Sequence, residues 1–84
     1  MKNENREVDF VIKSGAHISA LIQVTAELND ENYDREIGPM ASASERLNCN
    51  DLSIVTWGQE SVEEYKGKKI RVVPLWKWLL GIGQ

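Results

Sequence analysis

Hydrophobic and polar residues alternate along residues 7–13 and again along residues 18–25. Alternation with a period of two is typical of β-strands, because successive side chains point to opposite faces of a sheet. Residues 14–17 separate the two runs and contain Gly15, which suits the backbone conformations of a tight turn. The pattern predicts that the chain opens with a β-hairpin.

The length of the hairpin loop determines which residues face each other. A two-residue loop would set Asp9 opposite an apolar residue, whereas a three-residue loop would set it opposite Gln23 on the same face. We expect the three-residue loop, which brings these two polar side chains together.

A long helix is predicted after the hairpin. Asn29 is an N-cap residue followed by acids, which suit the positive end of a helix. The positions that recur at spacings of three and four are apolar except for one serine: Tyr33, Ile37, Met40, Ser44 and Leu47. Gly38-Pro39 interrupts this stripe, so we expect either a kink there or two helices with Pro39 in the first turn of the second.

The rest of the chain predicts two further strands. Residues 52–57 and 69–73 are rich in β-branched residues, and Pro74 ends the second run. Residues 60–65 are mostly polar and are expected to form a loop or a short turn of helix, and residues 75–80 a short helical turn or an apolar tail. The expected fold is α/β: a small mixed sheet of about four strands that opens with a hairpin, with the long helix packed on one face.

The composition is that of a small globular protein. The chain has 84 residues, of which 42% are hydrophobic and 27% charged. This size predicts a single domain over residues 1–84, with a polar, flexible lead-in at 1–6 and a core at 7–80. No apolar run is long enough to span a membrane, and the polar opening does not resemble a secretory signal. We therefore expect a cytoplasmic protein with no membrane partner.

Charge is distributed unevenly along the chain. Residues 27–36 hold five acids and one base, whereas residues 65–84 hold five bases and no acid. Two solvated faces would explain this, and so would a basic end that contacts the phosphate backbone of DNA. The second explanation assigns nucleic-acid binding to Lys66, Lys68, Lys69 and Arg71.

Four other residues could have either a structural or a functional role. Cys49 and His17 are each the only residue of their type, which favours a small thiol at the end of an element and a solvated turn histidine over a metal or catalytic site. Trp76 and Trp78 either cap an open end of the core or stack on a base or a partner.

Several segments, taken in order, resemble a known family. They are EVDFV at 7–11, LIQV at 21–24, Arg35-Glu36, Thr56-Trp57 and GKKIRVVPLWKWLL at 67–80. Their order and spacing resemble the nuclease-like C-terminal domain of unknown function found behind the ATPase of prokaryotic AAA-type ATPases, a branch of the PD-(D/E)xK nuclease superfamily. The resemblance covers residues 7–80 and implies a restriction-endonuclease-like core that lacks its first helix and strand.

The resemblance also implies where a catalytic site would lie. Asp9 stands at the position of the first aspartate, and Gln23 and Thr25 stand where the acid and the lysine of the motif would be. Such a nuclease needs a hard cation held by carboxylates and a lysine that acts on the attacking water. Gln23 is neutral and Thr25 has no amine, so Asp9, helped by Glu7, would bind Mg²⁺ weakly or not at all.

The function implied is therefore a catalytically degenerate nuclease-like domain that serves as a binding module, with an AAA-type ATPase and DNA as expected partners. One alternative is an active metal-dependent DNA nuclease with an unconventional site at Asp9, Gln23 and Glu7. A second alternative is a structural homodimerisation domain. The missing strand and helix would leave a sheet edge and an apolar face uncovered, so we expect a homodimer.

Overall fold

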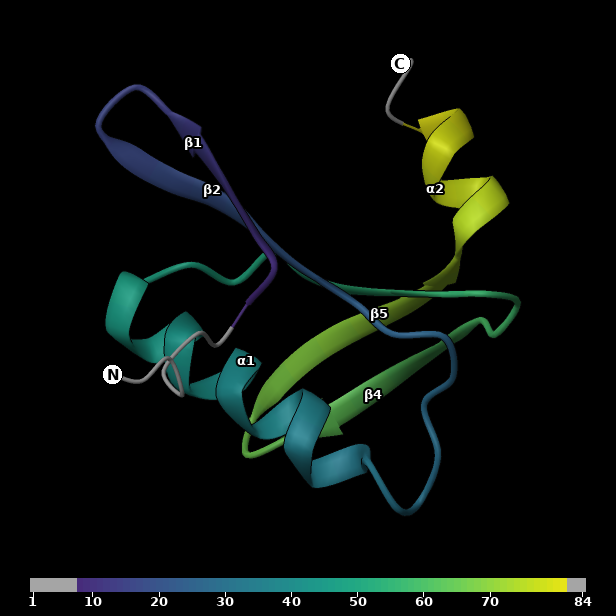
Figure 1. Ribbon diagram of the computed structural model, residues 1–84. Coiled ribbons are helices and arrows are strands. Elements are labelled where there is room, and N and C mark those ends of the chain that lie inside the picture. Colours follow the sequence, from purple (N-terminus) through teal and green to yellow (C-terminus); the bar gives the residue numbers. More distant parts are fainter. Residues whose placement is uncertain (1–7, 82–84) are drawn as a thin grey trace, which may run out of the picture.

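A mixed β-sheet of five strands forms the body of the molecule in the computed structural model, which describes residues 8–81 (Figure 1). The lead-in expected at 1–6 lies outside the described residues. The strands are β1 (Phe10–Ser14), β2 (His17–Val24), β3 (Leu52–Thr56), β4 (Ser61–Tyr65) and β5 (Lys68–Pro74), and their order in the sheet is β1-β2-β3-β5-β4.

The strand directions explain how the helices are placed. β1 and β2 form an antiparallel hairpin, as do β4 and β5, whereas β2, β3 and β5 run parallel to one another. Parallel neighbours need a crossover connection, and α1 (Tyr33–Leu47) supplies it between β2 and β3. The expected α/β class, with a mixed sheet and a long helix, is confirmed. Among the described residues, no helix has the length and apolar character to cross a membrane.

The core lies between α1 and one face of the sheet. Leu21, Leu52 and Ile70 sit side by side on three neighbouring strands and are buried beneath the helix. Ile37 and Met40 cover them from α1. Each fully buried side chain of this kind contributes about 1.5–3 kcal/mol relative to an exposed one. All five residues of β3, the central strand, are buried.

The apolar stripe of α1 is confirmed, including its serine. Ile37, Met40 and Ser44 are buried, and Ser44 Oγ donates a hydrogen bond of 2.6 Å to the carbonyl of Cys49. Because the hydroxyl is satisfied inside the molecule, a polar residue in the stripe carries little penalty. The thiol of Cys49 is itself buried in the core.

The helix starts later than Asn29 and continues through Pro39. Asn29 instead forms a turn before α1, where its Oδ1 accepts from the N–H groups of Glu31 and Asn32 at 2.9 and 3.0 Å. Tyr33–Leu47 is a single helix with Pro39 inside it, so the alternative of two helices is wrong. Gly38 helps to explain this, since a residue without Cβ avoids part of the clash with the following proline ring.

The prediction of four strands is wrong, because residues 61–65 form the fifth strand, β4, and not a loop or helical turn. β4 is an edge strand that pairs only with β5. Three of its five residues are Ser or Glu and Val62 is exposed, so hydrophobic alternation does not mark it. Its turn to β5 is Lys66-Gly67, where both residues take positive φ, 52° and 83°, as a two-residue hairpin turn of type I′ requires.

The loop between β1 and β2 has two residues, and the expected three-residue loop is wrong. Ser14 pairs directly with His17, and Gly15 takes a φ of 64° between them. The conformation is available to glycine because it has no Cβ. His17 is exposed beside this turn, as expected for a turn histidine.

A β-bulge in the hairpin produces the register that the longer loop was expected to give. The pairing shifts between Ile12 and Lys13, and Ser19 is the additional residue on β2. The hydroxyl of Ser19 donates to the carbonyl of Ile12 at 3.2 Å. Because of this shift, Asp9, the residue just before β1, lies opposite Gln23.

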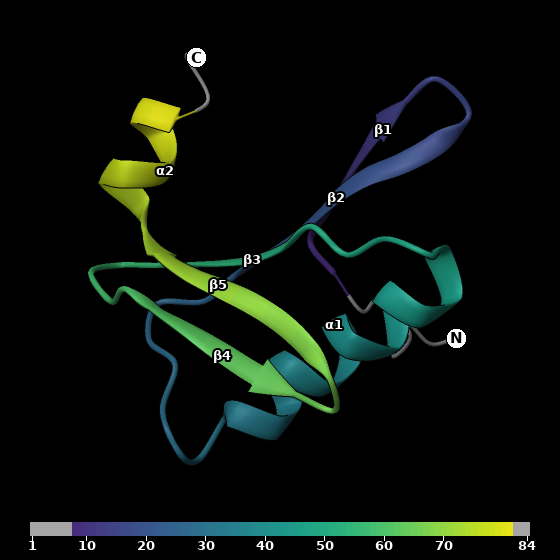
Figure 2. The ribbon, with the colours of Figure 1, turned by 180° about the vertical axis from the view of Figure 1, so that it is seen from behind.

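Two parts of the chain rise from the sheet on the side away from α1. One is the β1–β2 hairpin, and the other is α2 (Leu75–Gly81), which follows β5 directly. Figures 1 and 2 show the hairpin and α2 on either side of the central strands, with α1 below the sheet. The short helix expected near the C-terminal end is confirmed.

Tyr33 connects the start of α1 to the edge strand β4. Its hydroxyl donates to Glu63 Oε1 at 3.3 Å, and its ring packs edge-on against Tyr65 with 6.2 Å between the ring centroids. Burial, followed by the carboxylate of Glu63, raises the pKa of Tyr33 above its ordinary value of 10.0.

We predict a stability loss at alkaline pH that depends on Tyr33. A raised pKa in the folded state means that the contribution is fully present below about pH 10, the pKa of an unfolded tyrosine, and is lost as pH rises through the folded value. Urea unfolding from neutral pH upward should show a smaller alkaline decline in unfolding free energy for Tyr33→Phe than for the unmodified protein. Equal declines in the two proteins would contradict this.

Candidate functional site

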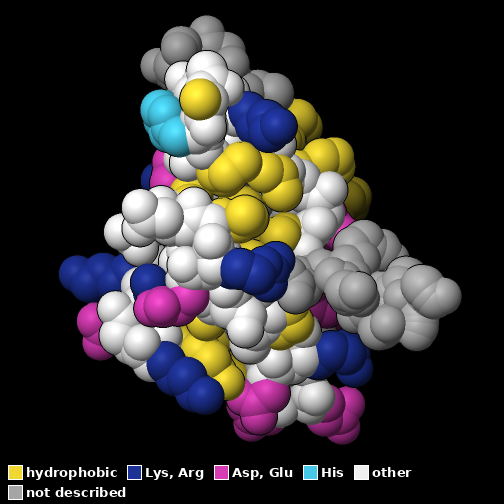
Figure 3. All heavy atoms as spheres, turned by 90° about the vertical axis from the view of Figure 1, so that its left-hand side faces the viewer, with side chains coloured by type: hydrophobic (Ala, Val, Ile, Leu, Met, Phe, Trp, Pro, Cys, Tyr) yellow, Lys and Arg dark blue, Asp and Glu magenta, His cyan; other side chains and the backbone are white. Residues whose placement is uncertain are grey.

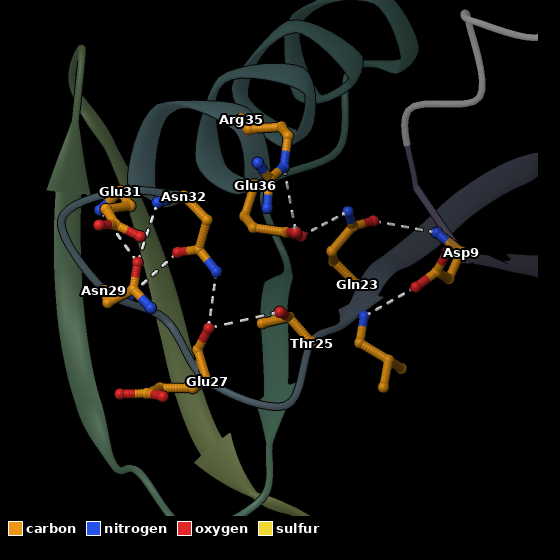
Figure 4. Close-up of polar contacts among 10 residues, drawn as sticks. Asp9, Gln23, Thr25, Glu27, Asn29, Glu31, Asn32, Arg35 and Glu36 are labelled. Carbon is orange, nitrogen blue, oxygen red and sulfur yellow. Dashed lines mark hydrogen bonds and ion pairs between the residues drawn. The ribbon is translucent and has the colours of Figure 1, made fainter.

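Asp9 and Gln23 meet where β2 ends. The backbone N–H of Asp9 donates to Gln23 Oε1 at 3.2 Å, and Asp9 Oδ2 accepts from the backbone N–H of Val24 at 2.9 Å (Figure 4). The carboxylate of Asp9 thus takes the place that a backbone carbonyl would have if the ladder of the hairpin continued. The expected contact between Asp9 and Gln23 is present.

Gln23 also reaches α1, which adds a residue that sequence reasoning did not assign to the site. Gln23 Nε2 donates to Glu36 Oε1 at 2.9 Å. The orientation of the amide follows from its partners, because the Asp9 N–H needs an acceptor and the Glu36 carboxylate needs a donor. The side chain of Glu36 is only 14% exposed. Asp9, Gln23 and Glu36, here named the polar cluster, therefore connect β1, β2 and α1.

The signal for Glu36 was present but ambiguous. It is one of two acids in the first turn of α1, where acids are favoured by the helix dipole regardless of any site. The exposed Arg35 lies 4.0 Å from Glu36 between Nε and Oε2, which is a weak surface ion pair. Only the packing of α1 on the sheet shows that Glu36, and not Asp34, bonds to Gln23.

Thr25 lies outside the polar cluster. Its hydroxyl donates to the carbonyl of Glu27 at 3.4 Å, and Figure 4 shows it turned away from Asp9. Its backbone N–H donates to the carbonyl of Val55 at 3.0 Å. Glu7, the second carboxylate expected to assist Asp9, lies outside the described residues.

The polar cluster does not fit a magnesium site in this arrangement. Mg²⁺ needs oxygen ligands in near-octahedral geometry. Gln23 instead directs its N–H₂ group at Glu36 and its oxygen at the Asp9 N–H, so donor hydrogens point at the carboxylate that would have to bind the ion. Within residues 8–81, no group of three or more His, Cys, Asp and Glu side chains is placed to hold a metal ion.

The basic residues assigned to nucleic-acid binding do not share one surface. Lys68 and Ile70 point to the α1 side of β5, whereas Lys69 and Arg71 point to the other side, because side chains alternate along a strand. Lys66 lies in the turn before β5, with its Nζ 5.6 Å from the centroid of the neighbouring tyrosine ring. Alternation along β5 thus divides the basic segment between the two faces of the sheet.

Two of these basic residues have acidic partners that lie far away in sequence. Lys68 Nζ is 3.3 Å from Glu45 Oε2. Arg71 forms an ion pair with Asp51 and donates to Ser53 Oγ at 3.0 Å. The uneven charge along the sequence is therefore partly balanced in three dimensions, which the order of the residues alone does not reveal.

A groove of about 600 Å³ lies on the face of the sheet opposite α1. The open faces of β2, β3 and β5 form its floor, and α2 forms one wall. Its lining is mainly apolar and includes Ala20, Ile22, Ser53, Arg71, Val73 and Trp78. Its volume is typical of sites that bind a ligand or a segment of a partner. Trp78 therefore lines the groove, and Trp76 is exposed on the same helix.

The polar cluster and the groove are the main candidate sites among residues 8–81. Comparisons of the chain with protein-family models, curated proteins and solved structures found no match. The functional interpretation therefore depends on the chemistry of these two features together with the order of the residues along the chain.

We predict that the polar cluster stabilises the fold through Gln23. Gln23→Leu removes both amide hydrogen bonds and leaves a largely buried carboxylate at Glu36 without its donor, so the free energy of unfolding should fall by about 1–3 kcal/mol. Glu36→Gln is the matched control, since its amide oxygen can still accept from Gln23, and should have a smaller effect. Urea unfolding of both variants measures this, and a change below about 0.5 kcal/mol for Gln23→Leu would contradict it.

Proposed function

We propose that this protein is a nuclease-like domain that has lost catalysis and acts as a binding module allied to an AAA-type ATPase. The support from the chain is the order of the residues that resemble that family, from Asp9 to the segment at 67–80. The support from the fold is that a hairpin, a crossover helix and a parallel strand occur in this order, with Asp9 and Gln23 adjacent at the end of β2.

The observation that carries the proposal is the bonding of Gln23. A working site of this type would have a carboxylate at that position, which together with Asp9 would hold a cation. Gln23 cannot ionise, and its amide hydrogen bonds link Asp9 to Glu36. The polar cluster therefore connects structural elements, and Asp9 is its one exposed carboxylate.

The position expected for the catalytic lysine supports the same conclusion. Thr25 has a neutral hydroxyl, and here that hydroxyl donates to a backbone carbonyl. It is therefore poorly suited to take a proton from an attacking water. Within the cluster, Asp9 is the one residue that retains its nuclease-like chemistry, and its Oδ2 already accepts from Val24.

We expect a protein partner rather than DNA. A phosphate backbone is bound by cations in excess of nearby acids, because affinity depends on the phosphates that are neutralised. Here Lys68 and Arg71 have acidic partners, and the basic residues of β5 lie on two faces. An AAA-type ATPase encoded immediately upstream of this chain would support the proposed alliance.

We predict that the protein does not cleave DNA. Purified protein should leave plasmid and branched DNA intact in the presence of Mg²⁺ or Mn²⁺, because a neutral glutamine and a threonine occupy the positions of the second acid and the lysine. Asp9→Ala serves as the control for a contaminating nuclease. Cleavage by the unmodified protein that disappears in Asp9→Ala would contradict the proposal and favour an active nuclease with an unconventional site.

We also predict that one substitution changes how the polar cluster responds to metal. Gln23→Glu places a third carboxylate between Asp9 and Glu36, so the variant should be less stable without metal and should gain thermal stability when Mn²⁺ or Mg²⁺ is added. The unmodified protein and Gln23→Leu should show no such gain. A thermal shift of equal size in all three proteins would show that the metal acts elsewhere.

A further inference from the structure

The face of the sheet opposite α1, here named the open face, lacks a helix over its centre (Figures 1 and 2). Its exposed and half-buried apolar side chains come from β1, β2, β4 and β5: Phe10, Ile12, Ala20, Val24, Val62 and Val73. Ile22 and Val55 lie on the same face and are buried. Figure 3 views the molecule from the outer side of the hairpin, where hydrophobic side chains are also exposed below the histidine. Extended apolar surfaces of this kind mark interaction sites on folded proteins.

α2 is an apolar helix that the other described residues cover only in part, at Leu75 and Trp78. Five of its seven residues are Leu or Trp, and none of the seven, all of which the structure describes, is buried. Trp76 is 59% exposed and Leu79 is 50% exposed. A helix that is mostly apolar is normally buried, because exposure of such side chains to water is unfavourable. The same chain therefore displays both an apolar helix and an apolar groove.

The charges on the open face are balanced. Arg71 pairs with Asp51, and Lys77 pairs with Glu60. Lys69 lies opposite Glu64 in the register of β4 and β5. A surface whose cations already have acidic neighbours is poorly suited to phosphates, which require uncompensated positive charge. The open face is therefore suited to a partner whose surface charges are also balanced. A second copy of this chain presents such a surface.

We propose that two copies of this chain pair through their open faces. α2 of each copy then lies in the groove of the other copy, between that copy's hairpin and that copy's α2. In a two-fold symmetric dimer the same surface is used twice, so a chain that carries both the helix and the groove is self-complementary. This inference goes beyond the proposed binding function and does not depend on whether the polar cluster has lost catalysis.

The surface available is of the size that a stable dimer needs. A standard interface takes about 800 Å² from each partner. An aromatic side chain buries about 150–250 Å² when fully covered, so half-exposed side chains such as Phe10 and Trp76 each offer on the order of 100 Å². Seven side chains with about half or more of their surface exposed lie on the open face and α2, and together they approach the required area: Phe10, Ile12, Val24, Val62, Trp76, Leu79 and Leu80.

Two neighbouring residues of β1 provide a matched test. Ile12 is 44% exposed and points to the open face, opposite Ala20, whereas Val11 is 43% exposed and points to the other face, opposite Leu21. Lysine at either position replaces a similarly exposed apolar side chain on the same edge strand. Ile12→Lys should convert the dimer to a monomer, and Val11→Lys should leave it intact.

The experiment is sedimentation equilibrium of the unmodified protein, Ile12→Lys, Val11→Lys and Leu79→Lys, with far-UV circular dichroism to confirm that each is folded. We expect dimers for the unmodified protein and Val11→Lys, and at least a tenfold weaker association for Ile12→Lys and Leu79→Lys. No metal or DNA is present, so the result is independent of the nuclease assay.

Three results would overturn the proposal. An unmodified protein that is monomeric at about 100 μM would exclude a dimer of useful affinity. Dissociation by Val11→Lys as much as by Ile12→Lys would indicate that the copies pair through the edge of β1 and not through the open face. A monomer that is retained on DNA in a salt-dependent way, with retention lost on charge reversal of Lys69 and Arg71, would identify the surface as a nucleic-acid interface.

Discussion

A five-stranded sheet has two faces, and within residues 8–81 a single long helix is available to cover them. α1 buries one face so completely that Leu21, Leu52, Ile54 and Ile70 are almost inaccessible to water. The second helix is short and stands at one side of the other face. On that other face Ile22 and Val55 are buried near the centre, whereas the side chains of the hairpin and of β4 stay exposed. This uneven cover is the constraint from which the position of the core, the groove and the exposed apolar side chains all follow.

The polar cluster depends on the same packing of α1. Asp9 and Gln23 are brought together by the hairpin, but the partner of the Gln23 amide comes from the helix that covers the sheet. Gln23 lies at the end of a strand, next to the buried face, where an unsatisfied amide would be costly. A neutral side chain that donates to one partner and accepts from another is therefore well suited to this position, whereas a carboxylate would meet a second carboxylate at Glu36.

The separation of the two features has a consequence for how function is distributed. The polar cluster lies on the α1 side of the sheet, and the groove lies on the opposite side. A loss of catalysis at the first would leave the second unchanged, because no residue lines both. Substitutions in the polar cluster can therefore change its chemistry without changing the side chains that line the groove.

Local sequence determined the elements whose signals are strong. Two-residue periodicity placed the hairpin, and spacings of three and four placed the buried face of α1, because these patterns report directly how side chains project from a strand or a helix. The contact between Asp9 and Gln23 was also accessible from the sequence. How the hairpin reaches this register was not predicted. A three-residue loop was expected, but a two-residue loop and a bulge at Ser19 together produce the same register.

Tertiary structure decided what depends on distant partners. β4 is recognisable only beside β5, because an edge strand with polar residues has a weak pattern of its own. Glu36 joins Gln23 only when α1 lies on the sheet, and Lys68 and Arg71 acquire Glu45 and Asp51 as partners only when β5 enters it. The sequence by itself thus determined which residues could meet by local geometry. The folded chain alone decided which charges are balanced and which apolar face is left open, because both depend on contacts between residues far apart in sequence.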